Sequence, residues 1–458
     1  MTLLTAGAGL TLALLYSASP LSAWVFVVAV VFCSMAGRGL PLEERRLLVA
    51  VLAASLAARA AFVGLRFLVD IPHHSDLSVG ALTGDEAYYL SRALRARDIA
   101  VGLAHTTYDY FVATDEYGRT SYLGLLTALQ VIFGPTPYSM RLLNALLFVA
   151  GATLLFLAVR PSLGALPAFG GLITLLFLPS LFVASVSLLK ESLYFLAASV
   201  LLVTAMRALR ARRTTEIAVL IAVAVVCVWA LNDLRRGAAV LTVLGLATGV
   251  AIRVVAVSRG RLVAAAGVCL LAGALALAQP TIQSRVIDGL ASAARAHAGH
   301  VFTVGHAYKL LDAGFYVNPN EPAEITGPQA ARFVWRAAVS FIVTPLPWEM
   351  RSLSERAFLP EHLLWYMILA LLVPGVRAGW KRDPLVTSLL LGYALPTAAA
   401  LALTNGNVGT LLRLRGLVTP YLIWLSALGL CVVGQAILKA RQAPGHPASV
   451  LHPEKAVL

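Results

Sequence analysis

Two adjacent carboxylates, Asp85 and Glu86, stand in a short polar interruption of a chain that is otherwise dominated by apolar runs. A carboxylate at a membrane surface can act as a general base toward a hydroxyl group, or it can bind a metal ion. We take Asp85 as the candidate base and Glu86 as a group that tunes Asp85 or holds a metal. Both residues could instead cap a helix that begins at Ala87, because acidic side chains favour helix N-termini.

Cationic side chains that could receive a phosphate occur in other polar interruptions of the chain. Arginine binds phosphate through two parallel hydrogen bonds, and lysine binds it as a point charge. Arg413 and Arg415 are the leading candidates, because they follow a predicted flexible turn at 405–410 whose glycines would let backbone amides approach an anion. The alternative is that they only anchor a helix end to lipid headgroups. The further substrate-binding candidates are Lys190, Arg141, Arg119, Lys309 and Tyr88.

Metal and cofactor sites have weaker signals. His297, His300 and His306 could hold a divalent metal, but no compact ligand motif accompanies them, and they are otherwise residues of a surface helix. The four cysteines all fall within apolar spans, where none is placed for a disulfide or a zinc cluster. The sequence therefore assigns no cofactor and no metal ligand, and a divalent metal is left open.

Composition indicates a membrane protein. The chain is 59% hydrophobic and only 13% charged, and its mean hydropathy is +0.82. Apolar runs of about 17 to 25 residues recur from end to end, and each is long enough to cross the hydrocarbon core as a helix. The net charge of +14 comes mostly from arginines beside these runs, where they orient helices and meet lipid headgroups. Membrane lipids are therefore expected partners, and nucleic acid is not.

The predicted fold is all-α, a single integral membrane domain over 1–458 with about twelve transmembrane helices. The predicted spans are about 2–17, 20–36, 47–69, 140–159, 163–180, 188–206, 214–232, 237–257, 261–280, 362–376, 384–403 and 417–438. Arg59 falls deep within 47–69, so it needs a buried partner or a wet cavity.

Four basic clusters orient these helices. They are Arg45 and Arg46; Arg207, Arg210, Arg212 and Arg213; Arg253, Arg259 and Arg261; and Arg377, Lys381 and Arg382. The positive-inside rule places all four in the cytoplasm, which leaves both termini and the tail 440–458 inside. The extracytoplasmic regions are then the loop 70–139 with the acidic motif, the large loop 281–361 and the short connection 404–416.

Two apolar stretches do not fit this scheme. Residues 121–134 and 337–346 are short for spans, and counting either as a full crossing would reverse the basic loops that follow. We predict that they are interfacial or re-entrant segments beside an outward-facing cleft. A short tilted crossing is the alternative.

The acidic motif resembles a known enzyme family. The run Gly84-Asp85-Glu86-Ala87-Tyr88-Tyr89, followed by Phe133-Gly134 and Arg141-Leu142, is similar to the GT-C membrane glycosyltransferases of the protein-mannosyltransferase and aminoarabinose-transferase type, the family 39-like enzymes. Later in the chain, Arg413-Leu414-Arg415 followed by Pro420 resembles the arginine-then-proline signature that opens a final helix in those enzymes. Relatives often carry an acidic residue and a Lys-Pro-Pro element before the next apolar run. This chain differs, because residues 115–122 read Asp-Glu-Tyr-Gly-Arg-Thr-Ser-Tyr.

The resemblance implies an enzyme of the cell membrane that uses a polyprenyl-phosphate sugar donor. Its acceptor would be an envelope glycan, lipid or protein reached on the extracytoplasmic side, with Asp85 as general base. Such a donor carries a good leaving group, so one base and a set of cations suffice, without the second acid of a two-carboxylate hydrolase. A polysaccharide polymerase or ligase that uses lipid-linked chains is the nearest alternative enzyme. A transporter or flippase is the non-enzymatic alternative, although no ATP-binding loop and no clear internal repeat is present.

Overall fold

The computed structural model describes residue 9 and the ranges 19–70, 84–116, 119–256, 258–303, 305–316, 325–350 and 356–442. This part of the chain is helical, apart from turns and one isolated antiparallel β-bridge between Ala307 and Asn407. The all-α prediction is therefore confirmed for the described residues. The predicted tail 440–458 and the segment before the acidic motif lie largely outside them.

Eight of the described helices are long and apolar enough to cross a membrane. They are α3 (Leu42–Asp70), α7 (Pro137–Leu163), α10 (Glu191–Ala208), α11 (Thr214–Leu234), α12 (Ala238–Val255), α17 (Leu359–Arg382), α18 (Pro384–Thr404) and α20 (Thr419–Gln442). A ninth crossing results if α8 (Ala165–Phe177) and α9 (Pro179–Val186), which are bent by 58° at their junction, form one span. The chain is thus a multi-pass helical membrane protein.

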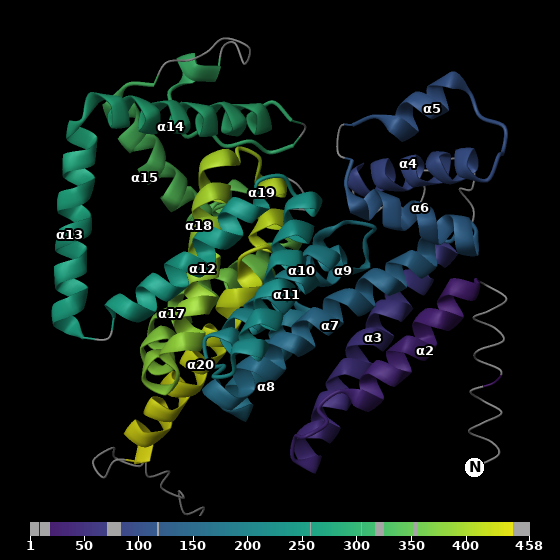
Figure 1. Cartoon of the computed structure of the whole chain (residues 1–458), viewed down its shortest axis with the longest axis horizontal. Coiled ribbons are helices and arrows are strands. Elements are labelled where there is room, and N and C mark those ends of the chain that lie inside the picture. Colours follow the sequence, from purple (N-terminus) through teal and green to yellow (C-terminus); the bar gives the residue numbers. More distant parts are fainter. Residues whose placement is uncertain are drawn as a thin grey trace, which may run out of the picture.

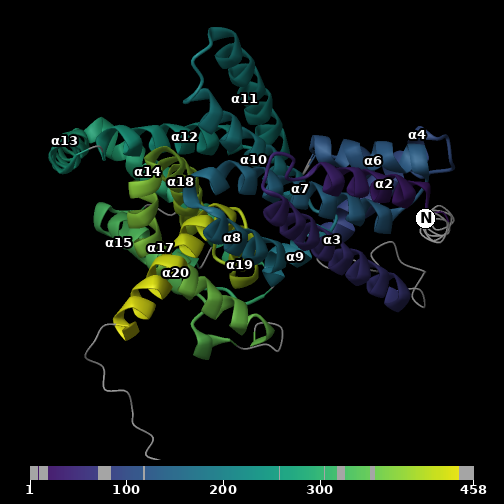
Figure 2. The same cartoon turned by 90° about the horizontal axis from the view of Figure 1, so that it is seen from below.

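The remaining predicted spans have other outcomes. The range 2–17 lies outside the described residues except for residue 9. The range 20–36 forms α2 (Pro20–Met35), which is apolar but has only 16 residues. The range 261–280 forms α13 (Arg259–Ala278), which is not among the eight helices. Both views show α2 and α3 on one side of the molecule and α13 on the other (Figures 1 and 2).

Glycines bring the membrane helices of the second half close together. A Cβ atom at Gly375 of α17 would lie 1.8 Å from the Leu425 carbonyl oxygen of α20, and one at Gly429 of α20 would lie 2.0 Å from the Leu371 carbonyl oxygen. Small residues let helix backbones approach in this way in membrane proteins, where lipid supplies no hydrophobic force between helices. This contact packs α17 closely against α20, the helix that follows Arg413 in the chain.

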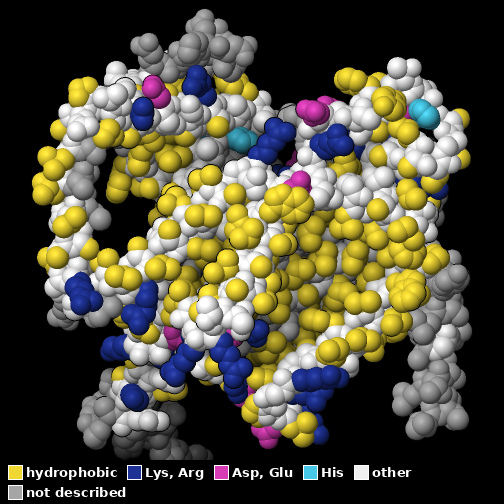
Figure 3. All heavy atoms as spheres, viewed as in Figure 1, with side chains coloured by type: hydrophobic (Ala, Val, Ile, Leu, Met, Phe, Trp, Pro, Cys, Tyr) yellow, Lys and Arg dark blue, Asp and Glu magenta, His cyan; other side chains and the backbone are white. Residues whose placement is uncertain are grey.

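Three predicted cytoplasmic clusters meet at one end of the helix bundle. Arg160 of α7 donates two hydrogen bonds to Glu44, beside the first cluster, at 2.9 and 2.6 Å. Arg210 of the second cluster contacts Asp383, and Arg382 of the last cluster donates to the Leu163 carbonyl oxygen. Lys and Arg side chains gather at this end, the lower one in Figure 3. These three clusters therefore lie on the same side of the bundle, whereas the side of the membrane that they face stays a prediction.

Helices outside the set of eight cover the opposite end. They are α4 (Gly84–Ala100), α5 (Thr107–Thr114), α6 (Ser121–Phe133), α14 (Pro280–Val301), α15 (Gly327–Val343) and α19 (Val408–Arg415). Helices α4 and α14 lie across the direction of the long helices (Figure 1). The apolar stretch 121–134 forms α6, of 13 residues, and 337–346 forms the end of α15 and the turn that follows. On α15 the buried residues Ala330, Phe333, Ala337 and Phe341 share one face, as expected for an interfacial helix.

Candidate functional site

The end that α4 and α19 share contains a cleft of about 440 Å³. The molecular surface is hollowed there, and basic and acidic side chains gather around the hollow (Figure 3). Its walls come from α4, from Glu116, Arg119 and Thr120, from the start of α10, from the α11–α12 connection and from α19. The lining residues are Asp85, Tyr88, Tyr89, Glu116, Arg119, Thr120, Leu189, Lys190, Glu191, Leu234, Arg235, Arg236 and Arg413. Five of the nine site residues predicted from the sequence, Asp85, Tyr88, Arg119, Lys190 and Arg413, are among them.

Asp85 and Arg413 form an ion pair in this cleft, between Oδ2 of the aspartate and Nη1 of the arginine. The Asp85 side chain is 56% exposed, and that of Arg413 is 30% exposed. Burial alone would lower the pKa of Arg413, but the nearby carboxylates of Glu191 and Asp85 outweigh burial and raise it. Arg413 therefore remains a cation next to an accessible carboxylate.

The turn at 405–410, which precedes Arg413, is hydrogen-bonded to 306–308, although the sequence predicts a flexible turn. The Tyr308 N–H donates to the Gly406 carbonyl oxygen at 3.0 Å, and the Val408 N–H donates to the His306 carbonyl oxygen at 2.8 Å. A Cβ atom at Gly406 would lie 2.4 Å from the His297 carbonyl oxygen, so close contact with α14 requires glycine here. The backbone groups of Gly406 and Val408 are thus engaged within the protein.

Glu86 points into the protein, away from the cleft. It is fully buried, and its Oε1 accepts hydrogen bonds from Arg141 Nε and from the Leu188 backbone N–H, both at 2.8 Å. Successive residues on an α-helix point about 100° apart, which separates Glu86 from Asp85. Arg141 is only 2% exposed. The Glu86–Arg141 pair therefore joins α4 to α7.

Charges of both signs line the cleft, with cations in excess. Arg119, Lys190, Arg235, Arg236 and Arg413 face Asp85, Glu116 and Glu191. Burial lowers the pKa of Lys190, nearby Arg235 lowers it further, and Glu191 partly offsets both effects. Glu191 Oε1 lies 3.5 Å from Arg235 Nη2. Such a cluster suits an anionic ligand of more than one charge.

A second, wider cavity of about 730 Å³ adjoins the cleft. The two cavities share Glu116, Arg119, Thr120 and Arg236. The wider cavity is bounded by α4, α5 and α6 and by Asp233 at the end of α11. The Ser121 backbone N–H donates to Asp233 Oδ2 at 2.8 Å, so the start of α6 is fixed to α11. Two ligands could therefore meet at the shared wall.

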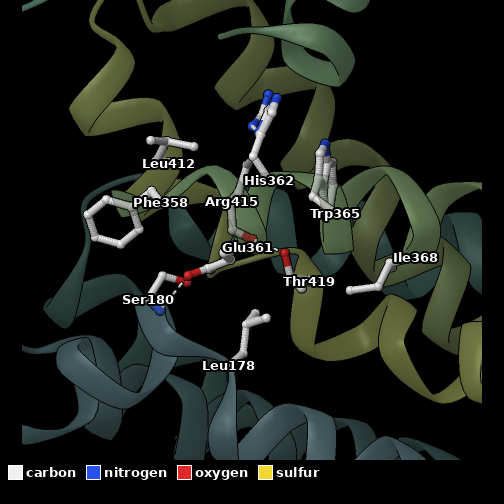
Figure 4. Close-up of a pocket in the computed structure, with 11 residues that line it drawn as sticks. Leu178, Ser180, Phe358, Glu361, His362, Trp365, Ile368, Leu412, Arg415 and Thr419 are labelled. Carbon is white, nitrogen blue, oxygen red and sulfur yellow. Dashed lines mark hydrogen bonds between the residues drawn. The ribbon is translucent and has the colours of Figure 1, made fainter. Parts of the chain in front are cut away.

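Arg141, Arg415 and Lys309 are not among the residues that line the cleft. Arg415 is buried, donates to the carbonyl oxygens of Phe341 and Thr344, and lies 5.1 Å from the Trp365 ring. It lines a separate cavity of about 30 Å³ with Glu361 and His362 (Figure 4).

Lys309 is exposed, and its Nζ lies 5.2 Å from the centre of the Tyr316 ring.

Among the described residues, the candidate histidines His297, His300 and His306 do not form a metal-binding group. His297 is buried, its Nδ1 contacts the Asn405 carbonyl oxygen, and burial lowers its pKa to about 4. Burial and nearby Arg413 lower the pKa of His300. Within the described ranges, no group of three or more His, Cys, Asp or Glu side chains could hold a metal ion. Three cysteines there, Cys33, Cys227 and Cys431, are free thiols.

Arg235 and Arg236 line the cleft, but the sequence reasoning did not select them. The sequence does contain an indication of their role, because the predicted topology places 233–236 on the extracytoplasmic side. A basic pair at an outer turn is an exception to the positive-inside rule, which favours arginine in cytoplasmic loops. Such an exception indicates a function other than orientation.

The cleft can hold a phosphate among several cations next to an exposed carboxylate. That combination suits transfer of a group from a phosphate leaving group to a hydroxyl acceptor. Comparisons of the chain with protein-family models, with curated proteins and with solved structures find no match. The functional argument therefore depends on the geometry of the cleft and on the motif in the sequence.

Proposed function

We propose that this protein is a GT-C-like membrane glycosyltransferase that moves a sugar from a polyprenyl-phosphate donor to an acceptor hydroxyl group. The observation that carries the proposal is the pairing of Asp85 with Arg413 in a cleft with further cations. A general base and a phosphate receiver are the two groups that this reaction requires.

The proposed reaction is one displacement at the anomeric carbon of the sugar. Asp85 accepts the proton of the acceptor hydroxyl group as its oxygen bonds to that carbon. The bond from the carbon to the phosphate oxygen breaks, and polyprenyl phosphate leaves with the electron pair. Arg413 and Lys190 stabilise the charge on the departing phosphate.

Donor phosphate and Asp85 compete for Arg413 in this proposal. Before the donor binds, the Asp85 carboxylate is occupied by the guanidinium group. The donor phosphate can bind arginine through two parallel hydrogen bonds, whereas Asp85 contacts Arg413 through Oδ2 alone, and the phosphate gains a second negative charge as it leaves. Binding of the donor therefore draws Arg413 away and leaves Asp85 free to accept a proton.

The two adjoining cavities support a reaction of two substrates. We assign the donor phosphate to the smaller cleft, which contains Asp85 and Arg413. The acceptor, a glycan, lipid or protein of the cell envelope, enters through the wider cavity and reaches Asp85 past Arg119 and Arg236.

The proposed orientation follows from charge. The basic clusters at the other end of the bundle belong in the cytoplasm by the positive-inside rule, so the cleft opens on the extracytoplasmic side of the cell membrane. A full set of about twelve spans belongs to the same proposal, with α2, α13, the bent pair and the segment before residue 19 added to the eight described spans.

The test is transfer of radiolabelled sugar from extracted polyprenyl-phosphate donors in membranes that contain the protein. Wild type is compared with Asp85→Asn and Arg413→Ala, and with Lys309→Ala as a cationic control outside the cleft lining. Protein abundance is measured in each membrane. We expect transfer by wild type and Lys309→Ala, and little by the other two variants. No transfer by wild type from any donor, or equal transfer by Asp85→Asn, would contradict the proposal and lead to tests of a polymerase or a transporter.

A further inference from the structure

The bend between α8 and α9 separates two backbone groups that a straight helix would join. In a continuous α-helix the Leu176 carbonyl oxygen would accept a hydrogen bond from the Ser180 N–H four residues later. Pro179 lies at the bend, where Leu178 has extended backbone angles (φ −62°, ψ 122°). Each of the two separated groups is bonded instead to a charged side chain from another helix.

Arg59 of α3 binds the carbonyl side of the bend. Its Nη2 donates to the Leu176 carbonyl oxygen at 2.8 Å, and its Nε donates to the Ser185 hydroxyl oxygen of α9 at 2.8 Å. The side chain is fully buried and lies 4.6 Å from the centre of the Phe182 ring. Arg59 therefore contacts both α8 and α9, which answers the need for a buried partner that the sequence indicated.

Glu361 of α17 binds the N–H side of the bend. Its Oε2 accepts a hydrogen bond from the Ser180 backbone N–H at 2.8 Å. Figure 4 shows the Glu361 side chain pointing toward Ser180, whereas neighbouring His362 and Trp365 point away from it. Because α3 and α17 come from opposite parts of the chain, the bend is held from two sides.

The bent segment leads directly into the wall of the cleft. Helix α9 ends at Val186, and the next four residues, 187–190, end with Leu189 and Lys190 in the cleft lining. The Leu188 N–H donates to Glu86, and the Asn144 side-chain amide donates to the Leu189 carbonyl oxygen at 3.0 Å. The course of α9, together with these two bonds, therefore decides where Lys190 lies.

We propose that Arg59 and Glu361 are positioning residues that hold Lys190 in the cleft by keeping α8 and α9 bent. Without them, the Leu176 carbonyl oxygen and the Ser180 N–H would lack partners in a region of low dielectric, where an unpaired backbone group is strongly disfavoured. Re-forming the bond between them would reduce the bend, although Pro179 still prevents a fully straight helix, and would shift 187–190. The catalytic consequence depends on the proposed function, but the structural role does not.

The test uses a single reporter cysteine at position 190. The four native cysteines are replaced, Lys190→Cys is introduced, and the rate of modification by a water-soluble maleimide is measured in membranes. Position 190 is half-buried in the parent, so displacement of 187–190 is expected to increase the rate.

Three substitutions of Glu361 separate the effect of side-chain length from the effect of side-chain charge. Glu361→Ala removes the acceptor, and Glu361→Asp keeps the charge but shortens the side chain. Both are expected to increase the rate about tenfold, the effect of losing one hydrogen bond to a charged group. Glu361→Gln keeps an oxygen at the same reach and is expected to label like the parent. Glu44→Ala is the matched control, because it removes a carboxylate bonded to Arg160 at the opposite end of the bundle.

The proposal is overturned if Glu361→Asp labels within about twofold of the parent, or if Glu361→Gln labels as fast as Glu361→Asp. Where Glu361→Ala does not accumulate in membranes, this comparison of Asp with Gln still decides the outcome.

A second measurement concerns activity, with Lys190 intact. In the transfer assay, Glu361→Asp is expected to raise the donor KM about tenfold and to lower kcat, because Lys190 also stabilises the departing phosphate, and Glu361→Gln is expected to restore both constants. Absence of transfer by wild type would contradict the proposed function alone, because the labelling rates still test the bend. Transfer by wild type with an unchanged donor KM in Glu361→Asp would contradict the role of the bend alone.

Discussion

Asp85 and Arg413 are separated by 328 positions in the sequence, yet their side chains form an ion pair in the cleft that α4 and α19 line. The pair joins the first turn of α4 to the last turn of α19. Both residues remain partly exposed, at 56% for Asp85 and 30% for Arg413. An exposed ion pair contributes little to stability, typically less than about 1 kcal/mol. Separating the two side chains therefore costs little free energy, so a competing anion can take the place of Asp85 beside Arg413.

Asp85→Asn is expected to lower kcat for sugar transfer by about a hundredfold to ten-thousandfold, the usual contribution of a general base. The donor KM is expected to stay unchanged or to fall, because asparagine competes less well than a carboxylate for Arg413. Steady-state kinetics with donor varied at fixed acceptor would measure both constants. A raised donor KM with unchanged kcat would assign Asp85 to binding instead of proton transfer.

Arg413→Ala is expected to raise the donor KM about tenfold to a hundredfold, since a hydrogen bond between charged groups contributes about 1.5–3 kcal/mol. Arg413→Lys is expected to lie between Ala and wild type, because lysine supplies charge without bidentate geometry. Competition by free polyprenyl phosphate measures the same contact without turnover. Equal inhibition constants for wild type and Arg413→Ala would refute the assignment.

Glu86→Gln is expected to act through stability. It leaves the buried Arg141 guanidinium without its carboxylate partner, and breaking a buried pair from one side typically costs about 3–5 kcal/mol. The double variant Glu86→Gln, Arg141→Met removes both charges and is expected to recover much of the loss. Thermal half-lives in detergent would test this. Glu86→Gln protein with the half-life of wild type but no transfer would instead indicate a direct chemical role.

Lys190 predicts a dependence on pH. Burial and Arg235 lower the pKa of Lys190, so its positive charge is lost as pH rises through a value below that of an ordinary lysine. Phosphate binding should therefore weaken on the alkaline side, and Lys190→Arg should move this weakening to higher pH, because arginine stays protonated. The donor KM measured against pH in both proteins tests the assignment. If the donor KM rises over the same alkaline pH range in wild type and in Lys190→Arg, a group other than Lys190 controls phosphate binding there.

The sequence predicts much of the scaffold because hydrophobicity is a local property. Each long apolar run predicts a membrane helix from its own residues alone. Eight of the predicted spans correspond to described helices of membrane length. The shared end of the basic clusters likewise follows from charge beside each span. The total of about twelve crossings stays a prediction, because it depends on short or bent segments such as α2 and the α8–α9 pair.

The composition of the cleft is decided by tertiary structure. The sequence alone determined that an acidic pair and several arginines stand in polar breaks of a multi-pass helical protein. Only the fold decided that Asp85 faces the cleft while Glu86 is buried against Arg141, and that Arg413 meets Asp85 while Arg415 binds carbonyl oxygens. The physical reason is that neighbouring residues on a helix point in different directions. Which direction meets which partner depends on contacts between helices far apart in the chain.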